Sequence, residues 1–110
     1  MKSRFIQEGG TLDYTNTTSA AIAAGDVVVF GSKVGIAATD IPVGSTGTVK
    51  MNGVFEVLKD ENEISLGAKV YYDPTNEIVT ATSNESTIEA GYAVSTATAS
   101  SSTVHIKLVG

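Results

Sequence analysis

The chain has 110 residues, a formal net charge of −5 at pH 7 and no cysteine. This length is typical of one domain, and the lack of cysteine excludes disulfides, thiolate zinc sites and thiol nucleophiles. The acidic balance argues against a nucleic-acid partner, because phosphate contacts need clustered Lys and Arg. No stretch approaches the roughly 20 apolar residues of a membrane-spanning helix, so we predict no membrane partner.

A four-residue phrase occurs four times along the chain. It consists of Ile, any residue, a small or aliphatic residue, and Gly, and its copies are residues 22–25, 41–44, 64–67 and 88–91. Glycine enters positive φ without a Cβ clash. We therefore predict that each copy is a turn that leads into a strand.

Short apolar and β-branched runs predict strands along most of the chain. In chain order they are residues 26–30, 33–37, 48–58, 69–72, 77–80, 92–94 and 103–109, with Asn52 and Gly53 as a turn or bulge within the third. The one candidate helix is the Ala-rich turn at residues 19–24, which Gly25 would end early.

The two halves of the chain resemble each other. Residues 25–30 match 67–72, residues 35–37 match 91–93, and residues 48–51 match 103–106, in the same order. We therefore predict an all-β fold, a small β-barrel or sandwich with a pseudo-twofold internal repeat and at most one short helical turn. Residues 1–110 are expected to form a single β domain, with residues 1–9 as an N-terminal arm that is free to move.

The residues that carry chemistry in other proteins form no recognisable site here. His105 is the only histidine, and without a second His or a Cys it is interpreted as a surface residue. The acidic residues Glu56, Asp60, Glu61 and Glu63 lack the spacing of a calcium loop and are interpreted as a solvated turn. Residues 43–50 lack the Gly-Lys-Ser/Thr ending of a phosphate loop. We therefore predict no catalytic residue, metal ligand or cofactor, and a protein that is not an enzyme.

Several segments together resemble a family of small tailed-phage and prophage proteins, the capsid decoration or cement proteins. The segments are residues 5–9, 12–14, 24–28, 34–37, 53–57, 67–73 and 104–108, which span nearly the whole chain. Gly67-Ala68-Lys69 departs from the Gly-Asp that the family more often has at this position. The Ser-rich residues 98–103 are peculiar to this chain.

The resemblance implies a protein that binds the outer surface of an expanded phage head and stabilises it. The implied partners are the major capsid protein and further copies of this chain, with a trimer favoured, on a virion assembled from proteins made in the host cytoplasm. Arg4, Phe5 and Ile6 are the predicted capsid contacts, with Phe5 and Ile6 as apolar anchors that add a strand to a capsid edge. Alternatively, this segment is simply the first strand of the domain.

The sequence is also compatible with two other functions. Tyr14, Tyr71, Tyr72 and Tyr92 could line a sugar site in a tail- or surface-associated carbohydrate-binding module. The acidic cluster could serve a small hydrolase, through an acid and base pair formed by two of its carboxyl groups.

Overall fold

The computed structural model describes residues 3–4 and 10–109, and these residues form strands, turns and loops without a helix. The strands are β1 (Thr11–Thr15), β2 (Val27–Phe30), β3 (Lys33–Ala37), β4 (Thr46–Lys50), β5 (Gly53–Leu58), β6 (Lys69–Asp73), β7 (Ile78–Thr80), β8 (Ile88–Ala93) and β9 (Thr103–Leu108). The structure confirms the all-β prediction, and the short helical turn expected at residues 19–24 does not form.

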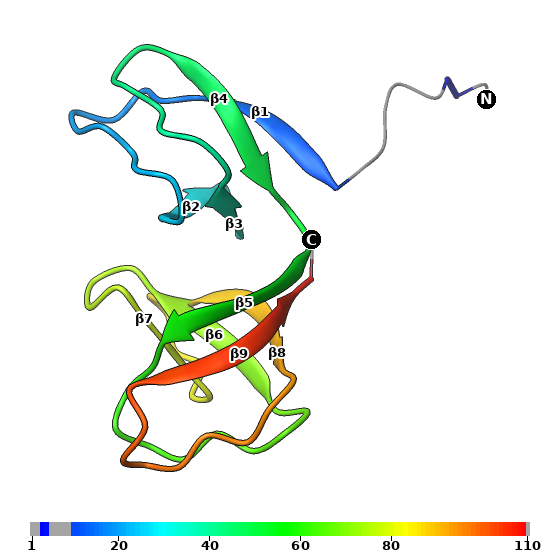
Figure 1. Cartoon of the computed structure of the whole chain (residues 1–110), viewed down its shortest axis with the longest axis vertical. Coiled ribbons are helices and arrows are strands. Elements are labelled where there is room, and N and C mark those ends of the chain that lie inside the picture. Colours follow the sequence, from blue (N-terminus) through cyan, green and yellow to red (C-terminus); the bar gives the residue numbers. More distant parts are fainter. Residues whose placement is uncertain (1–2, 5–9, 110) are drawn as a thin grey trace.

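The strands build two antiparallel sheets that lie one above the other in Figure 1. The first sheet has the order β1-β4-β3-β2, and the second has the order β5-β9-β8-β6-β7. The first four strands of the second sheet therefore repeat the order of the first sheet, and β7 is an addition. This shared strand order confirms the internal repeat.

The hydrogen bonds of the two halves repeat as well. The Gly25 amide donates to Ala37, and the Gly67 amide donates to Ala93, both at 2.8 Å. The predicted match of residues 48–51 with 103–106, however, is wrong by two residues. The equivalent residues Ala37 and Ala93 pair with Val49 and Ile106, respectively. Val49 therefore corresponds to Ile106, whereas the predicted match was Val104. A shift of two keeps every side chain on its own face of a strand, so the pattern of apolar residues does not reveal it.

Three of the four repeated phrases are turns, as predicted. Their final glycines, Gly25, Gly44 and Gly67, have φ values of 92°, 81° and 85°. The prediction is wrong for the fourth copy, because residues 88–91 lie within strand β8. The place of the fourth turn is taken by residues 97–100, since Ala97 forms a bridge with Ile64 as Ile41 does with Ile22.

Three further strand predictions need correction. The predicted strand at residues 48–58 is two strands, β4 and β5, which belong to different sheets, so Asn52 and Gly53 mark the passage between the halves. Strand β8 begins at Ile88, four residues before the predicted start. Strand β1 was not predicted, although its partly buried Leu12 and Tyr14 alternate with exposed polar residues.

The core has two parts. A small cluster inside the first half contains the buried side chains of Val28, Ala37, Ile41 and Val49. A larger cluster lies on the inner face of the second sheet and includes Val34 and Ile36 of β3. Strand β3 thus has both faces buried, one in each cluster, and it joins the two halves through apolar contact.

The second sheet curls into a half-barrel. Its edge strands β5 and β7 approach each other at one end, where Lys59 and Val79 form a parallel bridge and the Asp60 amide donates to the Val79 carbonyl at 3.1 Å. Away from this bridge, β2 and β3 of the first half lie over the opening of the curled sheet (Figure 1). A cleft opens at the edge of this junction, between β2, β5 and β7.

Each half contains one buried polar side chain directly after its first strand. The fully buried Asn16 donates from Nδ2 to the carbonyls of Ala20 and Ile41, both at 2.9 Å. At the same position of the second half, the Nζ of Lys59 donates to the carbonyls of three loop residues, Asp60, Thr98 and Ser101. The equivalence follows from the backbone, since the Asn16 amide donates to Ser45 and the Lys59 amide to Ser102. Both side chains thus tie loop carbonyls together by hydrogen bonding; two of these carbonyls, of Ile41 and Thr98, also accept from a backbone amide.

Candidate functional site

The predicted capsid contacts lie in the N-terminal segment. Arg4 is exposed, whereas Phe5 and Ile6 lie outside the described residues. The role of these three residues therefore stays a prediction. Sequence reasoning selected them because an apolar pair at a chain end needs a partner surface.

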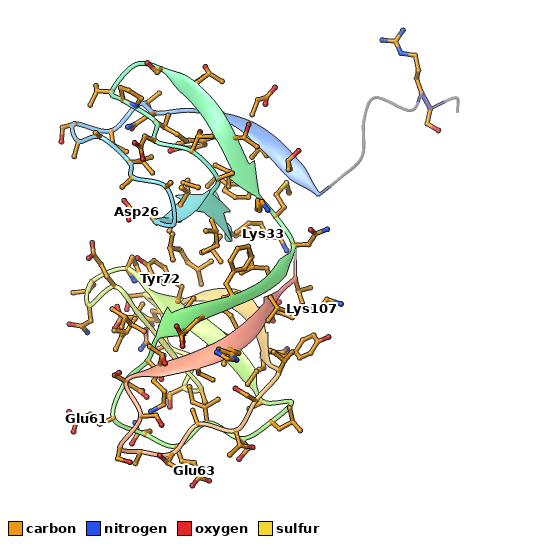
Figure 2. All side chains as sticks on the ribbon, viewed as in Figure 1. Asp26, Lys33, Glu61, Glu63, Tyr72 and Lys107 are labelled. Atoms are coloured by element: carbon orange, nitrogen blue, oxygen red, sulfur yellow. The ribbon has the colours of Figure 1, made fainter. Side chains whose placement is uncertain are left out.

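The predicted acidic cluster does not converge on one point. Glu56 lies on the outer face of β5, where it accepts a hydrogen bond from Thr103 Oγ1 at 3.3 Å and lies 3.5 Å from His105 Nε2. Asp60 accepts from the backbone amide of Asn62 at 3.1 Å, so it stabilises a turn. Glu61 and Glu63 lie in the loop at the far end of the second half (Figure 2). Within residues 3–4 and 10–109, no group of three acidic or histidine side chains could hold a metal ion.

The four tyrosines do not share a surface either. Tyr14 packs against the core cluster of the first half, and Tyr72 is buried in that of the second. Tyr71 and Tyr92 lie on the outer face of the second sheet, in neighbouring strands β6 and β8. The structure therefore separates the residues that a sugar-binding site would have needed.

The outer face of the second sheet presents apolar and cationic side chains together. Val54, Lys107, Tyr92 and Lys69 form one row across four neighbouring strands. Val54 is 60% exposed and Tyr92 37%. The Nζ of Lys69 lies 3.2 Å from Glu89 Oε1, and this hydrogen-bonded carboxylate raises the pKa of Lys69. Exposed apolar groups among charged ones are typical of surfaces that contact other proteins.

A cleft of about 340 Å³ opens where the two halves meet. Its lining consists of the start of β2, the C-terminal half of β5, Tyr72, and the segment from Glu77 into β7. Asp26 and Glu77 contribute two acidic side chains to it, from segments far apart in the sequence, whereas the carboxylate of Glu56 points to Thr103 and His105 on the outer face of the sheet. Sequence reasoning missed this cleft, because no single segment contains more than one of these carboxylates.

Comparison with known proteins gives one match. The family model described as phage cement protein matches residues 6–108. A search of the curated proteins and a search of the solved structures each returned no match. Among the described residues, no helix is long and apolar enough to span a membrane.

Proposed function

The chain belongs to the phage cement protein family, and we propose that it binds the outer surface of the expanded phage head and stabilises the shell. The observation that carries the proposal is the extent of the family match, which covers residues 6–108 of 110. This family is structural and acts in capsid decoration, so the protein is proposed to work by binding rather than by catalysis. Its immediate partner is then the major capsid protein.

The shape and charge of the molecule support this role. A core shared through β3 joins the two halves, which suits a protein that must resist deformation of a lattice. The net charge of −5 fits the outside of a head better than a surface facing packaged DNA. Because many copies act on one shell, each copy needs only modest affinity for the shell to be reinforced.

The proposed capsid contact is the N-terminal segment with Arg4, Phe5 and Ile6. An apolar pair beside a cation can anchor on a protein surface, and an extended segment can add a strand to an exposed sheet edge. The copies on a shell are proposed to assemble as trimers, which would bring three such segments to one place on the lattice.

Cosedimentation with purified heads tests the function. The protein should bind expanded, undecorated heads saturably and should leave unexpanded shells unbound. Absence of binding to both would refute a role in decoration. It would return weight to a tail- or surface-associated carbohydrate-binding module, which a glycan array tests directly.

Deletion of residues 1–8 tests the contact segment separately. We expect the shortened protein to keep its cooperative unfolding transition and to lose binding to heads, as should Phe5→Ser/Ile6→Ser in the full chain. Loss of the folded state on deletion would instead show that this segment is part of the domain. Sedimentation velocity of the same samples measures whether the free protein is a trimer.

A further inference from the structure

The cleft between the halves combines negative charge with apolar walls. Asp26 lies directly before β2, and Glu77 lies in the turn directly before β7. Between them lie the side chains of Val27, Val57 and Ile78. A ligand that fits this lining needs an apolar part and a positive charge.

The carboxylates of Asp26 and Glu77 form no ion pair with any of the described residues. Asp26 accepts a hydrogen bond from the Ala23 amide at 3.0 Å through Oδ2, which fixes its orientation. Glu77 has a left-handed backbone with φ of 56°, and its amide donates to the Asp73 carbonyl at 2.8 Å. The side chain of Asp26 and the backbone of Glu77 are thus fixed beside the cleft, and neither carboxylate is compensated by a cation.

Tyr72 provides a second, independent indication of a ligand. Its side chain is only 8% exposed and lines the cleft, near the junction of the two halves (Figure 2). Its hydroxyl makes no hydrogen bond to the described residues. Every fully buried side-chain polar atom in this part of the chain has a partner, so the unpaired Tyr72 hydroxyl is not fully buried, and Tyr72 lines the cleft. Burial raises the pKa of Tyr72, and the charges of Glu77 and Asp26 raise it further. The hydroxyl is therefore a neutral group, close to both carboxylates and able to accept a hydrogen bond.

The dispersed carboxylates favour an organic cation over a metal ion. The described residues include no group of three side chains close enough to ligate one metal. Lysine and arginine instead carry their charge on an apolar stem and donate several hydrogen bonds from one end. Such a side chain can lie against Val27 and Val57 while its charged end reaches the carboxylates and the Tyr72 hydroxyl.

We propose that this cleft binds a lysine or arginine side chain presented by the capsid protein. The choice of the capsid protein as the source rests on the proposed function, whereas the chemistry of the ligand rests on the cleft alone. The contact would lock a capsid segment between the two halves, at a place separate from the N-terminal segment.

Titration with capped arginine amide, followed by the backbone amide NMR signals, tests the cleft without any capsid. We expect saturable shifts at Val27, Leu58 and Glu77 in the millimolar range, and none with capped citrulline amide, the neutral isostere. Asp26→Asn/Glu77→Gln should abolish the shifts, and Tyr72→Phe should weaken binding. Equal shifts with citrulline, or none with arginine, would overturn the proposal.

Cosedimentation with expanded heads tests the source of the side chain. Asp26→Asn/Glu77→Gln should bind at least about tenfold more weakly than the natural chain. The control Glu61→Gln/Glu63→Gln removes the same charge from the distant loop and should bind normally; thermal melts establish that both variants are folded. Equal binding by both variants would overturn the capsid assignment while the decoration function stands. If the natural chain binds arginine amide but no heads, the decoration function fails and the cation site remains.

Discussion

Replacement of Lys59 by methionine tests the buried ammonium group at the far end of the second half. The side chain is 6% exposed, and its Nζ donates to the carbonyls of Asp60, Thr98 and Ser101 at 2.9, 3.0 and 3.0 Å. Methionine keeps most of the length and the apolar stem but donates no hydrogen bond. The substitution therefore isolates the three hydrogen bonds from the packing of the chain around them.

The size of the effect follows from the number of bonds. A hydrogen bond from a charged donor contributes about 1.5 to 3 kcal/mol to stability. Two effects reduce the loss in the variant: water hydrates the freed loop carbonyls, and folding no longer has to desolvate an ammonium group. With about 1 kcal/mol left for each bond, Lys59→Met should lower the free energy of unfolding by about 3 kcal/mol. For a domain of this size, the melting temperature should fall by about 10 °C.

Urea unfolding followed by circular dichroism measures the loss, with Lys69→Met as the control. Lys69 is exposed and forms a surface pair with Glu89, so its replacement should cost much less. Asn16→Ala should resemble Lys59→Met, because it removes the equivalent buried donor of the first half. If Lys59→Met and Lys69→Met were equally stable, the carbonyl contacts of Lys59 would contribute nothing and the reasoning would be refuted.

Two further predictions concern backbone space and a titrating turn. Gly91→Ala should lower the free energy of unfolding by about 3 kcal/mol or more, because a Cβ there would overlap the carbonyl of Lys107. Gly25→Ala should lower it by only about 1 kcal/mol, because a Cβ at Gly25 meets open space. Equal losses in urea unfolding would contradict this reasoning. The Asn76 side chain donates to the Asp73 carboxylate at 2.8 Å and lowers the pKa of Asp73, so this bond stabilises the fold above the unfolded-state pKa and is lost as the pH falls through the folded-state value. Asn76→Ala should return the pKa of Asp73 towards its ordinary value in a carboxyl NMR titration, and an unchanged pKa would disprove the assigned cause.

The sequence predicted the strands best where local signals agreed. The hairpin of β2 and β3 was placed almost to the residue, because β-branched runs flank a Gly-Ser turn. The sequence could not show that Asn52 and Gly53 separate two sheets, since a turn within one sheet uses the same residues. The fourth turn escaped prediction because its position has Ala97 and Ser100 where the other copies have Ile and Gly.

The candidate sites were harder to predict than the strands. Lys59 lies beside acidic residues that suggest a solvated turn, and only the folded loops turn its ammonium group inward. The cleft combines Asp26, Tyr72 and Glu77, whose proximity depends on how the two halves pack. A feature made by tertiary packing leaves no local pattern in the chain.

The duplicated halves also begin and end at one place. The Met51 amide donates to the Gly10 carbonyl at 2.9 Å, and Gly53 pairs with Leu108, so the start of the first half, the link and the last strand meet at the junction in Figure 1. Each half thus begins and ends at the same place, so a short connection is enough to join it to the other half. A circularly permuted chain, opened at Asn52 and joined through a linker between Leu108 and Gly10, would keep every strand pair. The order of the two halves along the gene is therefore expected to be interchangeable without loss of the fold.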